Sequence, residues 1–154
     1  MRKLDLSLAP DELDGYLRSQ STVRLATINA DGTPHVVPLW FVWLDGTAFM
    51  NSTLGNRTLR NLDRDPLATA CVDDGTTYDD LRGVLLHGPV ERAENDPRIA
   101  DVEHRWSEKY LAGNPVPFQH WKNRVWLQMT PERITSWDFR KIPEARAKAG
   151  AGGG

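Results

Sequence analysis

The sequence predicts a mainly β domain in which six or seven antiparallel strands form a barrel, with two or three helices flanking it. Residues 22–29 have the period of a strand, with Val23, Leu25 and Thr27 on one side. The pairs Asp31-Gly32 and Asp45-Gly46 each separate two strand-like runs, as turns of β-hairpins do. A barrel with helices at its rim is the simplest way to bury several such strands together.

Helices are predicted at three places. Pro10 suits a first helical turn, and Asp11 and Glu12 suit its positive end. Residues 55–63 follow a strand and are predicted to form a short helix. A longer helix is expected after Asp96, with Gly113 placed to end it. The predicted strands cover residues 22–29, 34–43, 47–52, 67–73, 84–92, 124–129 and 133–139, and the second of them is expected to be buried on both sides because both its faces are apolar.

Composition limits the class of protein. The chain has 154 residues, 40% of them hydrophobic and 26% charged, which is typical of one globular domain. We expect this domain to span residues 1–142 and the Ala- and Gly-rich residues 143–154 to form a disordered tail. The net charge of −2 predicts neither a nucleic-acid nor a membrane partner. A single cysteine, Cys71, and the lack of a signal-peptide pattern favour a cytoplasmic protein, and no metal-ligand spacing is present.

The segment most indicative of chemistry is residues 51–62. It follows a predicted strand, opens a predicted short helix, and is dense in polar side chains. Arg57 and Arg60 are three residues apart, so one helical face can offer both guanidinium groups to an anion beside the helix N-terminus. This pattern predicts a phosphate cradle. The alternative is structural: the polar residues cap the helix, and the two arginines pair with Asp63 and Asp65.

Several motifs together resemble the pyridoxamine 5′-phosphate oxidase-like split-barrel flavoproteins, over about residues 8–140. They are the hairpin LAT…DGTPHVVP, the run RTLRNLDRDPLA, the strand GVLLHGPVE and the closing Trp137-Asp138-Phe139. The resemblance implies a split β-barrel of the FMN-binding type. It also implies a homodimer whose two coenzyme sites lie at the subunit interface. The coenzyme phosphate would lie near Ser52, Thr53, Arg57, Thr58 and Arg60, with Asn51 and Asn56 alongside, and the coenzyme ring would lie against His35, Val36, Val37 and Pro38.

One departure from the family affects the choice of coenzyme. Pyridoxamine phosphate oxidases carry an arginine and a lysine on the second strand, whereas this chain has no cation from Val36 to Trp40. Thr58 also stands where a lysine is common. The pattern is therefore closer to the branch that uses the deazaflavin coenzyme F-420, and FMN is the main alternative.

The expected activity is transfer of a hydride from reduced coenzyme F-420 to a small organic acceptor. Hydride transfer needs no acid or base from the protein, so no catalytic side chain is predicted. Tyr78 and Trp40 are candidates for the substrate pocket. Three alternatives remain open: an FMN-dependent oxidase or reductase, a protein that binds FMN or the deazaflavin without turning over a substrate, and a structural split barrel that has lost its ligand.

Overall fold

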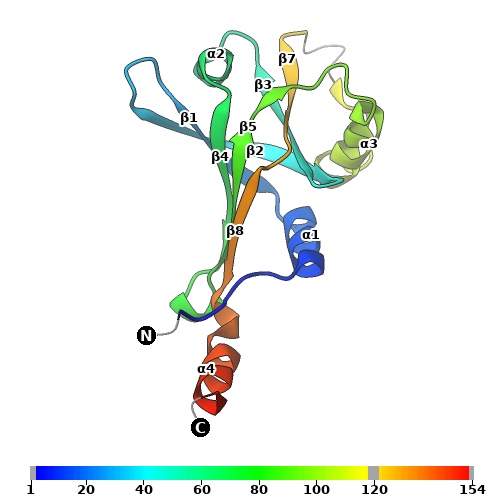
Figure 1. Cartoon of the computed structure of the whole chain (residues 1–154). Helices are drawn as coiled ribbons and strands as arrows, with labels where there is room; N and C mark the ends of the chain where they lie inside the picture. Colours follow the sequence, from blue (N-terminus) through cyan, green and yellow to red (C-terminus); the bar gives the residue numbers. More distant parts are fainter. Residues whose placement is uncertain (1–2, 118–121, 153–154) are drawn as a thin grey trace.

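The structure is a computed structural model, and it describes residues 3–117 and 122–152. Within these residues, eight strands form one antiparallel sheet in the order β6-β7-β3-β2-β1-β4-β5-β8, and four α-helices flank it (Figure 1). The strands are β1 (Thr22–Ile28), β2 (Pro34–Leu44), β3 (Thr47–Thr53), β4 (Leu67–Asp74), β5 (Arg82–Pro89), β6 (Glu91–Arg92), β7 (Arg124–Met129) and β8 (Arg133–Asp138). The helices are α1 (Pro10–Ser19), α2 (Arg57–Arg64), α3 (Ile99–Tyr110) and α4 (Ile142–Ala151).

Strand β2 joins the two halves of this split barrel. Its first part, up to Trp40, pairs with β1, and its second part, from Phe41, pairs with β3. Tyr110 of α3 binds β2 at the point where its pairing partner changes from β1 to β3. The Tyr110 hydroxyl accepts a hydrogen bond from the Phe41 amide at 3.0 Å and donates one to the Phe41 carbonyl oxygen at 2.7 Å. The second part of β2 is buried, but the first part alternates between exposed and half-buried residues. The prediction that β2 is buried on both sides is therefore wrong for its first half, because no other layer of this protomer covers that face.

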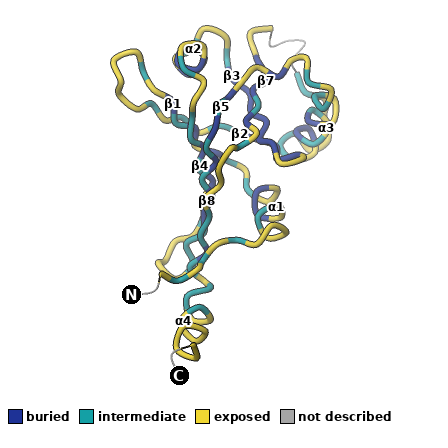
Figure 2. Tube along the Cα trace, viewed as in Figure 1, coloured by how far each residue is buried: buried dark blue, intermediate teal, exposed yellow. Residues whose placement is uncertain are grey.

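Two apolar clusters form the core. The larger fills the concave side of the sheet, where Leu25, Phe41 and Met50 are fully buried, and α1 covers it with Tyr16 and Leu17. The second lies under α3, whose Val102 and Trp106 pack on the opposite side of β2, β3 and β7. The sheet thus has a helix-covered face beside α3 and an open face along β1 and β4 (Figure 2).

Three sequence expectations need correction. The strands number eight rather than six or seven, since the predicted strand 84–92 is divided: β5 pairs with β4 and β8, and β6 pairs with β7. Pro89, which cannot donate a backbone hydrogen bond, lies at that division. The helices number four rather than two or three within the described residues. The fourth, α4, replaces the expected disorder after residue 142.

Helix α4 forms although none of its residues is buried (Figure 2). Pro143 occupies its first turn, its alanines favour helix, and Lys148 lies 2.8 Å from Glu144 one turn earlier. Local propensity therefore explains the helix, whereas the prediction of a disordered tail considered only packing. No described helix is both long and apolar enough to cross a membrane.

Candidate functional site

The turn before α2 is organised by Asn56. Its side-chain oxygen accepts from the Leu59 amide at 2.9 Å, which caps the helix, and its amide nitrogen donates to Ser52 Oγ at 2.9 Å. Gly55 allows the turn through its positive φ of 77°, with open space where a Cβ would lie. The capping interpretation is thus correct for Asn56. The other backbone amides of the first turn of α2 can still donate to an anion at the positive end of the helix.

Arg57 and Arg60, two of the three arginines of α2, are exposed and do not make the ion pairs that the structural alternative required. Among the described residues, neither Arg57 nor Arg60 forms a salt bridge, and Asp63 lies 3.4 Å from Arg92 instead. The Asp31 carboxylate has a lowered pKa, chiefly because Thr33 donates hydrogen bonds to it and also because Arg57 is nearby. Both guanidinium groups therefore remain available to a bound anion.

A buried amide attaches α2 to β1. Asn61 donates to Thr27 Oγ1 at 3.1 Å and to Asn29 Oδ1 at 2.9 Å, and its own oxygen accepts from Arg64 at 3.1 Å. Arg64 also donates to the Ile28 carbonyl oxygen. These bonds fix the position of α2 against the first hairpin, and hence the direction in which its N-terminus points.

The predicted phosphate residues differ in accessibility. Ser52 and Thr58 are buried, so their side chains serve the interior of this protomer. Thr53 is half-buried, and Arg57 and Arg60 are exposed. An anion at this turn would therefore meet the two guanidinium groups, Thr53 and backbone amides.

The predicted ring-binding residues lie on two faces of β2. The register pairs His35 with Thr27 and Val37 with Leu25, which places these two on the concave side. Val36 and Pro38 point to the opposite side, together with Trp40, because side chains alternate along a strand. Val36 is 57% exposed and Trp40 48%. A planar ligand on the outer side would meet the side chains of Val36, Pro38 and Trp40, and would reach His35 and Val37 only through the backbone.

A cavity of about 290 Å³ opens beside this outer side of β2. Asn51 is one of its walls: the residue is 8% exposed, and its amide nitrogen is buried without a hydrogen-bond partner. A buried donor without an acceptor costs roughly 1–3 kcal/mol, so the Asn51 amide nitrogen is a candidate donor to a ligand in this cavity. The lining residues are Pro38, Leu39, Trp40, Asn51, Trp106, Leu111 and Arg124.

Aromatic side chains form one wall of this cavity. Trp40 stacks on Tyr110, with ring centres 4.4 Å apart and planes 5° apart. Trp106 meets Trp40 at 6.1 Å and Trp126 at 5.0 Å, edge to face in both cases. The Tyr110 hydroxyl is held at the Phe41 backbone, so the stack has a fixed orientation. A rigid aromatic surface of this kind suits a planar ligand.

Sequence reasoning missed Arg124 as a site residue. It stands at the first position of β7, where it pairs with Thr53, and it lines the cavity with Asn51 and Trp40. No local motif surrounds Arg124; only the pairing of β3 with β7, 71 positions apart at Thr53 and Arg124, brings it here. The cavity therefore contains a cation that β2 itself lacks.

Tyr78 lies elsewhere. It is 69% exposed in the segment between β4 and β5, and its ring is 5.0 Å from that of Phe139. It does not line the cavity beside Trp40, so the two predicted substrate residues are not brought together in this protomer. Among the described residues, no group of three or more His, Cys, Asp or Glu side chains could hold a metal ion.

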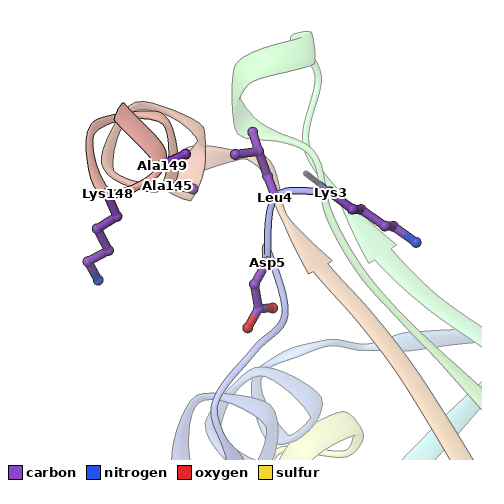
Figure 3. A pocket seen from close by; sticks show the side chains of 6 residues that line it. All are labelled: Lys3, Leu4, Asp5, Ala145, Lys148 and Ala149. Atoms are coloured by element: carbon purple, nitrogen blue, oxygen red, sulfur yellow. The ribbon is translucent and has the colours of Figure 1, made fainter. Parts of the chain in front are cut away.

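Another cavity, of about 250 Å³, lies between the N-terminal segment and α4 (Figure 3). Leu4 extends toward Ala145 and Ala149 of α4 there, whereas the side chain of Lys3 points away from the helix. It contains none of the predicted site residues and no aromatic side chain. We therefore place the candidate site at the cavity beside β2 and at the adjoining α2 turn.

Comparison with known proteins agrees with this architecture. A biliverdin reductase of Mycobacterium tuberculosis that depends on reduced coenzyme F-420 is 28% identical over 126 residues, covering 80% of this chain and 85% of the relative. A 5a,11a-dehydrotetracycline/5a,11a-dehydrooxytetracycline reductase of Streptomyces rimosus is 34% identical over 97 residues, covering 56% and 68%. The crystal structure of a conserved hypothetical protein from Mycobacterium tuberculosis superposes with a TM-score of 0.82 at 30% identity, covering 93% and 92%.

The sequence model for pyridoxamine 5′-phosphate oxidase matches residues 9–138, which is most of the chain. This span begins just before α1 and ends with β8, so it includes every strand of the sheet and both parts of the candidate site. The protein belongs to the pyridoxamine 5′-phosphate oxidase-like split-barrel family.

Proposed function

We propose that this protein is a reductase that binds coenzyme F-420 and directs a hydride to a small organic acceptor. The observation that carries the proposal is Asn51, whose buried amide donor lacks a partner in an aromatic cavity beside β2. The relative that depends on reduced coenzyme F-420 supports the choice of coenzyme. The absence of a cation on β2 supports a coenzyme other than that of the pyridoxamine phosphate oxidases.

The residues present fit such a coenzyme. A flavin or deazaflavin ring is planar and carries carbonyl oxygens at one edge, so it offers an aromatic surface to Trp40 and an acceptor to Asn51. The phosphate would be held by Arg57, Arg60 and the first amides of α2. Arg124 lies between these two parts, beside Thr53, and adds positive charge for the anionic coenzyme.

When bound, the reduced deazaflavin supplies the hydride. The protein's own contribution is orientation and exclusion of water. The stack of Trp40 on Tyr110 positions the ligand plane, and burial raises the pKa of Tyr110 to about 12, so its hydroxyl stays neutral and holds Phe41 throughout the physiological pH range. No described side chain has to gain or lose a proton in hydride transfer itself.

We propose further that two copies of the chain form the working unit. The register places Val36, Ile28 and Leu67 on one open side of the sheet, where each is more than 40% exposed. A second protomer would bury this apolar surface and cover the outer side of β2, which completes the coenzyme site. Light scattering of the purified protein should give a dimer, and Val36→Glu should shift it toward monomer with loss of coenzyme binding.

FMN is the second candidate, because the family match includes enzymes of FMN chemistry and nothing in the cavity excludes an isoalloxazine ring. Titration with each coenzyme separately, followed by fluorescence quenching, distinguishes the two. Tighter binding of coenzyme F-420 than of FMN supports the proposal, and the reverse order contradicts it. Multiple turnovers with an acceptor panel then separate an enzyme from a protein that only carries its coenzyme.

A further inference from the structure

A second group of cations surrounds a different cavity, of about 280 Å³, between α1, β2 and α3. Helix α3 contributes to both cavities: Trp106 and the C-cap residue Leu111 line the aromatic one, whereas Lys109 lines this one with Arg105. None of its residues belongs to the coenzyme site. The lining residues are Arg18, Val42, Trp43, Arg105, Glu108 and Lys109.

The Lys109 ammonium is only partly satisfied. It donates one hydrogen bond, to the Phe41 carbonyl oxygen at 3.0 Å, although it carries three protons. It also lies over the Phe41 ring at 4.3 Å, and no carboxylate forms a salt bridge with it among the described residues. Burial lowers its pKa from 10.5 to about 8, which means that the surroundings do not compensate its charge.

The two arginines add unfilled donors. Arg105 Nε is buried and makes no hydrogen bond, although Asp101 Oδ2 lies 3.5 Å away. Arg18 makes no ion pair within the part of the chain that the structure describes. The one carboxylate of the cavity, Glu108, is directed at His104 instead, at 3.4 Å. Among the described residues, Lys109 and Arg18 thus have no carboxylate partner, Arg105 is paired only with Asp101, and the carboxylate of Glu108 is directed at His104.

We propose that this cavity binds a small organic anion, a carboxylate on an apolar or aromatic body. The carboxylate oxygens would accept from the remaining protons of Lys109 and from the guanidinium groups of Arg18 and Arg105. Val42 and Trp43 form the apolar side of the cavity and contact the body of the ligand. This site is independent of the proposed coenzyme site.

Binding should depend on pH in a defined direction. The groups that face Lys109 are Arg18 from α1 and Arg105, Glu108 and Tyr110 from α3, and β2 contributes no titratable group. Burial brings the pKa of Lys109 to about 8, so its charge changes near that pH. An anion favours the protonated amine, so its affinity is highest below pH 8 and falls as the pH rises above that value.

The test measures Lys109 directly. The protein is labelled with a trace of acetic anhydride, which reacts with neutral amines, and the extent of labelling at each lysine is followed by mass spectrometry across pH. Benzoate is the probe, and neutral benzamide is its matched control. An increase of one unit in the pKa of Lys109 reduces its labelling at pH 8 about fivefold.

Protection of Lys109 by benzoate, but not by benzamide, supports the proposal, with exposed Lys148 unchanged as the internal reference. The double variant R18Q/R105Q keeps Lys109 in place and should lose the protection. Equal protection by inorganic phosphate would contradict a role for the apolar body. Unchanged labelling with benzoate, or full protection in the double variant, would overturn the site.

Discussion

The two parts of the proposed coenzyme site differ in how the chain builds them. The α2 turn is local: its cap, its glycine and its two arginines lie within residues 52–60. The aromatic cavity is assembled from β2, β3, α3 and β7, so its walls come from residues 38 to 124. The comparison teaches that charge for binding an anion can be encoded in a short motif, whereas a fitted surface for a ring requires the whole sheet. Variants in the two parts should therefore differ in how they change coenzyme affinity and protein stability.

The largest effect is expected at the local part. Replacing Arg57 and Arg60 together by Ala should weaken coenzyme binding more than about 100-fold, since each bond to a charged group contributes roughly 1.5–3 kcal/mol. Thermal stability should hardly change, because both side chains are exposed and make no ion pair among the described residues. Titration calorimetry and a melting curve measure both, with Arg146→Ala on exposed α4 as control. Unchanged coenzyme affinity would contradict phosphate binding by Arg57 and Arg60. A large loss of stability would support the alternative that the two arginines make structural ion pairs.

Asn61 tests whether the local part depends on its anchor. Asn61→Ala leaves Thr27 and Asn29 without their shared donor, so the free energy of unfolding should fall by roughly 1–3 kcal/mol. Coenzyme affinity should fall about tenfold, because α2 loses its fixed direction. Urea denaturation measures the first effect, and Asn95→Ala on the surface is the control. A stable Asn61→Ala variant with normal coenzyme affinity would show that the turn before α2 keeps its binding geometry without the Asn61 hydrogen bonds.

Asn51 tests the cavity. Asn51→Leu keeps the number and branching of the side-chain heavy atoms and removes the unpaired donor, so the free protein should become more stable, by up to about 1–3 kcal/mol. Coenzyme affinity should fall about tenfold in the same variant, which is the pattern of a residue kept for a ligand. Melting curves without and with coenzyme F-420 measure both changes. A variant that is less stable and still binds normally would contradict the role of Asn51.

The smallest effect is expected from a single aromatic ring. Trp40→Leu should weaken coenzyme binding severalfold, since a stacked aromatic pair contributes roughly 0.5–1.5 kcal/mol beyond its buried area. Tyr78→Leu is the matched variant, because Tyr78 is also an exposed aromatic but lies against Phe139. Fluorescence titration of both variants compares the two positions. A larger loss for Tyr78→Leu would mean that a partner subunit brings Tyr78 to the site.

The strands, their hairpins and the α2 turn were predictable because their signals are short-range. Glycine turns, apolar alternation and the Asn56 cap operate within a few residues, and β1, β3, β4 and β7 appear close to their predicted positions. The structure of the segment after residue 142 also depends on local signals: α4 forms there through helix propensity although it packs against nothing that buries it. The family followed from the order of the motifs rather than from any one of them.

The rest was decided in three dimensions. Sequence shows that residues 34–43 are apolar, but only the pairing of β2 with β1 and then β3 leaves its first half open and buries its second. Sequence shows Asn51 and Arg124 as separate polar residues, and only the β3–β7 ladder makes them walls of one cavity. The reason is physical: propensity and turn chemistry act between neighbours, whereas exposure, unpaired donors and cavities depend on which distant strands pair.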